Sequence, residues 1–210
     1  TVSAQTVPAK SDEGKLIAVL RSDASHKEKV DACRGLALIG TKKSIAPLAA
    51  LLGDEKLSHM ARYALEPIQN PAVDVAFRDA LGTLKGKPLI GVIGSVGVRR
   101  DTKAVPALAK LLHDPQAAGA ASRALGNIGN LDAAKALTGA MIADSTAKHA
   151  NDRYEGLLRC AESLAAEGQK SEAIGIYDHL LGLPTPHQVR AGALRGAILT
   201  RGIKEGERRR

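Results

Sequence analysis

The chain has 210 residues and a formal net charge of +8, and it is 44% hydrophobic and 25% charged, which excludes a disordered composition. It has no run of 18 apolar residues, so the sequence predicts no membrane span. With one Phe, three Tyr and no Trp, the core is expected to consist of Ala, Leu, Ile and Val in thin, closely packed helical layers.

The positive charge is not concentrated in a footprint typical of nucleic-acid binding. The last ten residues, RGIKEGERRR, hold five basic and two acidic groups, so +3 of the +8 lies there and +5 is spread over the other 200 residues. Residues 201–210 are therefore expected to form a basic C-terminal tail. Residues 1–10, which begin with Thr1 rather than Met, are polar and unpatterned, and we expect a disordered or processed N-terminal stub.

Apolar residues recur at helical spacing along the chain and predict about twelve helices. The first three predicted pairs are 12–20 with 27–39, 44–53 with 57–68, and 73–84 with 88–96. The next three are 103–112 with 116–128, 131–142 with 149–166, and 171–181 with 187–199. Helices this short are marginal alone, and loops of a few residues force antiparallel neighbours. The predicted fold is all-α, an α-α superhelix of about six helical hairpins forming a single solenoid domain over residues 11–200.

The sequence repeats itself with a period of about 30 residues. A shift of 60 residues aligns a series of apolar, small and acidic positions: Ile45 with Val105, Leu48 with Leu108, Leu51 with Leu111, Leu52 with Leu112, Asp54 with Asp114, Ala64 with Ala124, Leu65 with Leu125, and Ile68 with Ile128. A shift of 89 residues aligns Leu36, Ile39 and Gly40 with Leu125, Ile128 and Gly129. Such self-similarity is typical of stacked repeat proteins.

The repeat resembles the HEAT family in its short, glycine-punctuated form, which also occurs in phycobilin lyases. The matching features are a Pro in the first helix (Pro47, Pro106), an Asp in the turn (Asp54, Asp114) and the close ALGNIG at 124–129. The resemblance covers residues 12–167, and the last pair drifts toward a tetratricopeptide-like spacing. It implies an armadillo-like solenoid whose second helices line a concave binding face.

A looser likeness concerns the setting of the array. The segments LSHMARYALEP and GVIGSVGVRRD resemble arrays in large secreted proteins of environmental bacteria. This resemblance suggests a segment of a longer chain, and it favours a periplasmic or secreted location over a cytoplasmic one.

Motifs of catalysis are not found. The glycine run 91–97 would need a preceding strand to act as a phosphate loop, but helices are predicted on both sides, so we interpret it as a site of close helix packing. The six His are scattered without the His-Glu pairs of di-iron HEAT hydroxylases, and no GxSxG occurs. Cys33 and Cys160 lack a CxxC context and are expected in the core. We therefore predict no catalytic, cofactor-binding or metal-binding residue.

The polar positions of the second helices are the candidates for binding a partner, with a merely solvated face as the alternative. They are rich in Tyr and Arg, which are enriched at interface hot spots. The candidates are His59, Arg62, Tyr63, Glu66, Arg123, Asn127, Arg153, Tyr154 and Arg159.

The sequence favours a monomeric, non-enzymatic scaffold that binds a protein partner or a neighbouring domain of a longer chain. The first alternative is a HEAT-like nucleic-acid-binding protein, such as a DNA repair enzyme, although the lack of Trp provides poorly for base stacking. A metal-dependent enzyme is the second alternative.

Overall fold

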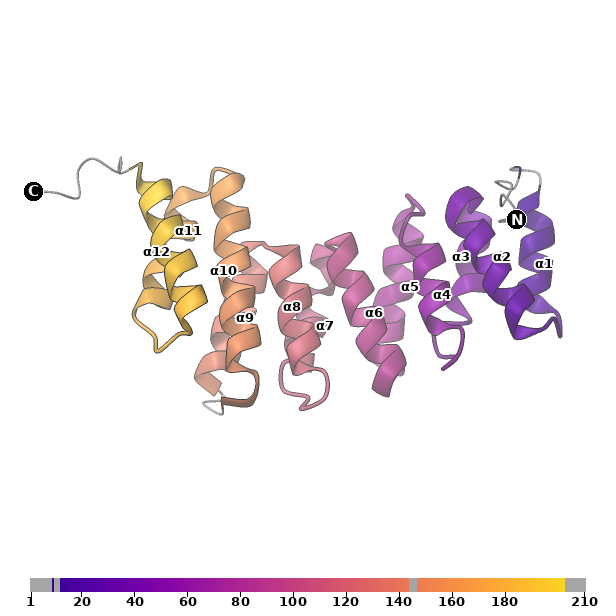
Figure 1. Cartoon of the computed structure of the whole chain (residues 1–210), viewed down its shortest axis with the longest axis horizontal. Coiled ribbons are helices and arrows are strands. Elements are labelled where there is room, and N and C mark those ends of the chain that lie inside the picture. The colour runs from indigo at the N-terminus through magenta and orange to yellow at the C-terminus, as the bar shows by residue number, and fades with distance from the viewer. Residues whose placement is uncertain (1–8, 10–11, 144–146, 203–210) are drawn as a thin grey trace, which may run out of the picture. The chain divides into compact units, whose positions relative to one another are not determined.

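The computed structural model describes residues 9, 12–143 and 147–202, and these residues form twelve α-helices and two short 3-10 helices (Figure 1). None of the described residues lies in a β-strand, so the predicted all-α class is confirmed. The predicted N-terminal stub, apart from Ala9, and residues 203–210 of the predicted tail lie outside the described residues.

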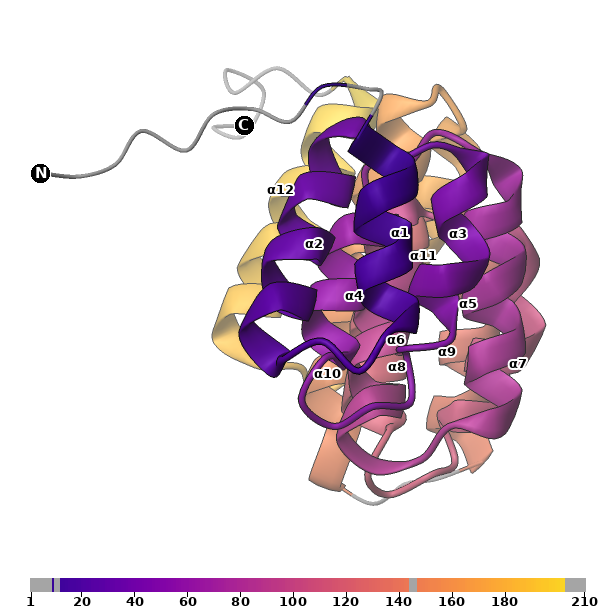
Figure 2. The same cartoon turned by 90° about the vertical axis from the view of Figure 1, so that its right-hand side faces the viewer.

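The chain divides into two compact units, residues 1–99 and residues 100–210. The first unit contains α1 (Glu13–Arg21), α2 (His26–Ile39), α3 (Lys42–Ala49), α4 (Ser58–Leu65), α5 (Pro71–Thr83) and α6 (Gly86–Arg99). Helix α3 packs against both α1 and α5, and α4 packs against both α2 and α6. The odd-numbered helices thus form a first layer and the even-numbered helices a second layer, with α2 and α4 side by side in Figure 2.

The second unit repeats the two layers over its first four helices. It contains α7 (Val105–Leu111), α8 (Ala118–Ile128), α9 (Leu131–Ala143), α10 (Ala150–Ala166), α11 (Lys170–Leu181) and α12 (His187–Arg201). Short 3-10 helices at Thr102–Ala104 and Ala147–His149 precede α7 and α10. Helix α9 packs against α7, while α10 packs against α8, α9, α11 and α12. The prediction of one continuous domain over residues 11–200 stays a prediction.

The glycine run 91–97 lies inside α6, as expected, so it is a helix and not a phosphate loop. Pro88 is in the first turn of this helix, where its missing N–H removes no helical hydrogen bond. The expected close packing holds at Gly91, where an added Cβ would meet the Arg62 guanidinium. It does not hold at Gly94, which is exposed and has no neighbour within 4 Å of such a Cβ.

Leu, Ile, Val and Ala side chains make up most of the core of both units, as the composition predicts. Two of the four aromatic residues add to this core: Phe77 of α5 and Tyr177 of α11 are each at most 2% exposed. Tyr177 lies against Gly196 of α12, whose missing side chain provides the room for the ring. The expectation of a purely aliphatic core is therefore wrong at one position in each unit.

Helices α8 and α10 cross at two glycines. A Cβ added to Gly126 would lie 2.8 Å from the Cα of Gly156, and a Cβ added to Gly156 would lie 2.8 Å from the carbonyl oxygen of Ser122. Because both neighbours are backbone atoms, neither clash can be relieved by rotating a side chain. Glycine at these two positions therefore fixes how closely the second-layer helices approach.

A buried carboxylate joins α1 to the start of α3. Glu13 accepts hydrogen bonds from the Thr41 backbone N–H at 2.7 Å and from the Ser44 hydroxyl at 2.6 Å. Burial alone would raise the pKa of Glu13, but these hydrogen bonds outweigh it and hold the pKa below its ordinary value of 4.5. The carboxylate satisfies donors at the N-terminus of α3 and is also favoured by the helix dipole there.

We predict that Glu13→Gln lowers the free energy of unfolding by about 1–3 kcal/mol at pH 7. Because the folded pKa of Glu13 is depressed, its stabilisation is fully present above pH 4.5 and is lost as the pH falls through the folded pKa. Urea unfolding at pH 7 and pH 3 should therefore show a wild-type advantage that shrinks in acid. The exposed Glu55→Gln variant is the control and should match the wild type at pH 7. An equal deficit of Glu13→Gln at both pH values would contradict the assignment.

At the crossing of α8 and α10, we predict that Gly126→Ala destabilises the protein by about 1–3 kcal/mol, because the new methyl group meets backbone. Gly175→Ala in α11 is the matched control, since its Cβ would have no neighbour within 4 Å. Alanine there should be neutral or stabilising by up to about 1 kcal/mol, as expected for a glycine replaced inside a helix. Thermal unfolding of the two variants measures the difference. Equal melting temperatures would refute the close crossing.

Both thiols are free and buried, Cys33 in α2 and Cys160 in α10. Burial raises the pKa of Cys33 to about 11 and that of Cys160 to about 12. The unreduced protein should therefore react with dithionitrobenzoate very slowly at pH 8 while folded. It should release two equivalents of thionitrobenzoate at once when denatured. A Cys33–Cys160 disulfide found by mass spectrometry would contradict this account.

Candidate protein-binding groove

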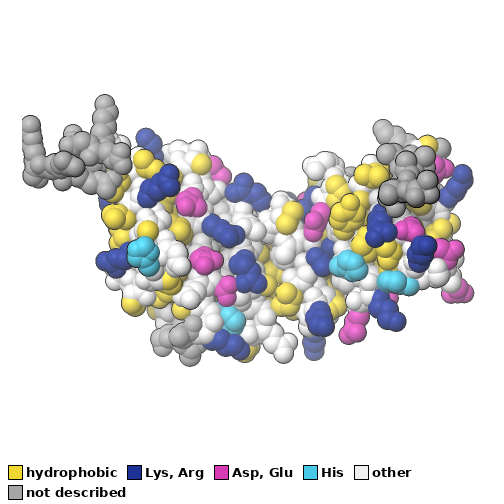
Figure 3. Space-filling view, in the orientation of Figure 1, with side chains coloured by type: hydrophobic (Ala, Val, Ile, Leu, Met, Phe, Trp, Pro, Cys, Tyr) yellow, Lys and Arg dark blue, Asp and Glu magenta, His cyan; other side chains and the backbone are white. Residues whose placement is uncertain are grey.

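A groove of about 630 Å³ lies between α2 and α4 on the second layer of the first unit. In Figure 3, hydrophobic side chains gather over these helices together with charged and histidine side chains. We call this depression the α2–α4 groove. Its lining residues are Arg34, Leu38, His59, Met60, Arg62, Tyr63 and Glu66. Four of the nine predicted partner-binding residues therefore lie together in one depression.

Helix α2 forms one wall of the groove. Its start is fixed by a capping box, in which Ser25 accepts from the Glu28 N–H and Glu28 accepts from the Ser25 N–H. Arg34 and Leu38 are four residues apart and so lie on the same helical face. Leu38 is 63% exposed, and Arg34 forms a solvent-exposed ion pair with Asp31.

Helix α4 supplies the other wall. His59, Arg62, Tyr63 and Glu66 follow the i, i+3, i+4, i+7 spacing that aligns side chains on one helical face. Tyr63 is 55% exposed, whereas Met60 is buried and contributes the sulfur-containing floor. The wall therefore presents an aromatic ring and polar groups above an apolar base.

Arg62 packs against α6 at Gly91, where the missing side chain leaves room for the guanidinium. Its Nη1 donates to the Gly91 carbonyl oxygen at 3.2 Å, and a Cβ at Gly91 would lie 2.6 Å from its Cζ and Nε atoms. Its Nε is buried and has no hydrogen-bond acceptor among the described residues. Burial lowers the pKa of Arg62, and the negative charge of Glu66 opposes this effect.

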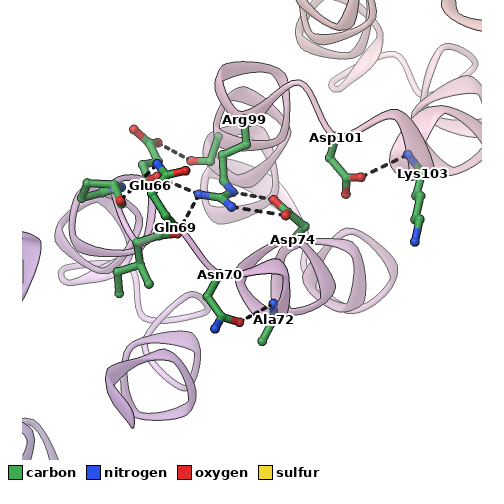
Figure 4. Close-up of polar contacts among 11 residues, drawn as sticks. Glu66, Gln69, Asn70, Ala72, Asp74, Arg99, Asp101 and Lys103 are labelled. Carbon is green, nitrogen blue, oxygen red and sulfur yellow. Dashed lines mark hydrogen bonds and ion pairs between the residues drawn. The ribbon is translucent and has the colours of Figure 1, made fainter. Parts of the chain in front are cut away.

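Hydrogen bonds join the Glu66 side chain and the C-terminal end of α4 to α6 (Figure 4). The Glu66 carboxylate accepts a hydrogen bond from the Ser95 hydroxyl at 2.7 Å. Arg99 of α6 donates to the backbone carbonyls of Glu66 at 2.8 Å and Ile68 at 3.1 Å, and it forms an ion pair with Asp74 of α5. These bonds satisfy carbonyls at the C-terminus of α4 and so fix the wall that carries Tyr63.

The second unit places its predicted residues in polar contacts between second-layer helices. Arg123 of α8 forms an ion pair with Asp152 of α10 at 2.7 Å, and Arg159 of α10 donates to Asn127 at 2.9 Å. Asn127 is half-buried and its backbone carbonyl also accepts from Arg100. These side chains are shared between neighbouring helices and are only partly available to a partner.

Two further predicted residues have different environments. Tyr154 is half-buried on α10. Arg153 is only 2% exposed and donates to the backbone carbonyl of Leu112. The prediction that Arg153 contacts a partner is therefore wrong, because this side chain belongs to the interior of the second unit.

Sequence reasoning missed Arg34, Leu38 and Met60. A signal for the first two was present, because the shift of 89 residues that aligns Leu36 with Leu125 also places Arg34 on Arg123 and Leu38 on Asn127. The repeat register thus points to the α2 wall. Met60 carried no such signal, since it lies on the apolar side of α4.

Two further properties concern the described residues. Among them, no group of three or more His, Cys, Asp or Glu side chains is placed to hold a metal ion. None of the helices over residues 12–143 and 147–202 combines the length and apolar character needed to span a membrane.

No protein-family model matches the chain, and no curated protein matches it. Among solved structures, it is similar to the crystal structure of an engineered protein from a structural genomics consortium. The two are 19% identical, with a TM-score of 0.47, over 91% of this chain and 97% of the engineered one. At this level, the similarity carries no argument about function.

Proposed function

We propose that the chain is a HEAT-type α-α superhelix of about six helical hairpins that serves as a non-enzymatic, protein-binding scaffold. Consecutive helices pack as pairs in both units, α1 with α2 and α7 with α8, and the pairs are joined through their layers. This arrangement is the one that stacked helical hairpins require. The partner is a separate protein or a neighbouring domain of a longer chain.

The α2–α4 groove is the observation that carries the proposal. Exposed Leu38 and Tyr63 lie beside Arg34, Arg62 and His59, so apolar contact area and hydrogen-bond donors occur together. Tyr and Arg around an apolar centre are the composition of interface hot spots. A solvated face would instead need no large exposed apolar side chains at neighbouring positions.

The experiment uses a photo-crosslinking amino acid to compare protein binding at the two helix layers. It is placed at position 63 in the second layer or, as control, at position 75, an exposed valine of α5 in the first layer. In extract of the cells that make the chain, we expect a protein adduct from position 63 and none from position 75. The purified partner should bind wild type and Val75→Ala equally, whereas Tyr63→Ala should raise the Kd about tenfold or more.

Equal crosslinking from both positions, or an affinity unchanged by Tyr63→Ala, would refute binding through the second layer. The nucleic-acid alternative is tested in parallel with a labelled DNA duplex. Binding with a logarithmic salt slope of several units would favour that alternative, because each neutralised phosphate releases counterions. The scaffold proposal expects no such binding.

A further inference from the structure

We infer that the α2–α4 groove binds a protein segment in which an Asp or Glu side chain lies next to a large apolar one. Arg62 receives the carboxylate, and Leu38, Met60 and Tyr63 receive the apolar side chain. The inference rests on the proposed function for the occupant being a protein, and it adds the chemistry by which that protein is recognised.

Arg62 has unused hydrogen-bonding capacity. A guanidinium carries five N–H donors, and here only Nη1 has an acceptor, the Gly91 carbonyl, among the described residues. Its Nε is shielded from solvent, so water does not replace the missing acceptor. The lowered pKa of Arg62 has the same origin, since burial leaves its charge poorly solvated. The Nη2 donors also have no acceptor among the described residues but are not shielded in this way, and a carboxylate supplies both an acceptor for them and the opposite charge.

The charge balance of the lining selects a single negative charge. Two arginines and one histidine face one carboxylate, Glu66, which already accepts the Ser95 hydroxyl. Arg34 is paired with Asp31 at the surface, whereas no ion pair within 4 Å holds Arg62 among the described residues, so Arg62 is the arginine of the lining that an occupant's carboxylate would meet. A phosphate with close to two charges would be repelled by Glu66 and would gain nothing from the apolar lining.

An acidic side chain fits better than a chain-terminal carboxylate. Terminal carboxylates are captured by clusters of backbone N–H groups. Leu38, Arg62 and Tyr63 instead extend from the body of α2 and α4, away from the free N–H groups of the helix starts. The apolar contribution comes from Leu38 and Tyr63, both more than half exposed, above the adaptable thioether of Met60.

The test starts with a displayed library of random twelve-residue peptides, selected against the full chain. The enriched peptides should share an Asp or Glu beside Leu, Ile, Phe or Met. One such peptide, synthesised with a fluorophore, then serves as the probe for fluorescence anisotropy. Arg62→Gln should raise its Kd at least about tenfold, as expected for the loss of a charge-assisted hydrogen-bond pair. Leu38→Ser should weaken binding as well.

Two variants separate the role of Arg62 from net charge. Gly91→Ala leaves every charge in place but adds a methyl group where the guanidinium lies, and it should also weaken the probe. Arg190→Gln removes an exposed charge on α12 and should leave the Kd unchanged. Melting temperatures within the error of the wild type for Arg62→Gln establish that the loss is not unfolding.

A double-mutant cycle gives the decisive comparison. The probe with its Asp or Glu changed to Asn or Gln should bind Arg62→Gln and wild type about equally, because the bonded pair is already broken. Additive losses would overturn the carboxylate assignment. If Tyr63→Ala still weakens binding of the probe in that case, the proposed function stands even though the carboxylate assignment fails. Enriched peptides without acidic residues, no enrichment, or displacement of the probe by a DNA duplex in an Arg62-dependent manner would each overturn the inference.

Discussion

Second-layer helices can approach one another closely only where side chains are small, and this constraint decides what the chain presents at its surface. In the second unit, Gly126 and Gly156 let the backbones of α8 and α10 meet. In the first unit, Ala61 and Ala64 are fully buried on α4, and Gly91 of α6 provides space that Arg62 fills. Close packing replaces the bulk that aromatic rings usually supply to a core.

The same constraint produces the α2–α4 groove. Ala61, Ala64 and Leu65 of α4 are buried, and the residues at positions 59, 62, 63 and 66 lie on its outer face, where they line the groove. Arg62 is the exception that turns back toward α6, and it becomes half-buried without gaining enough acceptors. The bonds of Glu66 and Arg99 then hold the end of α4 in place. The groove is thus a consequence of helix packing rather than an addition to it.

Much of the fold could be predicted because apolar periodicity, Pro and Gly carry helix signals that depend on local sequence alone. The α4 wall was predicted for the same reason, since His59, Arg62, Tyr63 and Glu66 share one helical face. The burial of Arg153 could have been predicted from the sequence, because Arg153 lies on the apolar helical face that continues through Leu157, Cys160 and Leu164. The contact of Arg62 with Gly91 was not, because it depends on how two helices pack across 29 residues. The division into two compact units could not be predicted either, because the amino-acid composition does not change at the boundary between them.

Packing against Gly91 holds Arg62 in place before any partner binds, and the Nε–H signal of Arg62 tests this directly. In a proton–nitrogen NMR spectrum of the unbound protein, this signal should be resolved and should exchange with water far more slowly than that of the exposed Arg190. The Gly91→Ala variant should lose the protection, because its methyl group displaces the guanidinium. An Arg62 signal that exchanges as fast as that of Arg190 in the wild type would mean that Gly91 does not hold the guanidinium in place, and it would contradict the account.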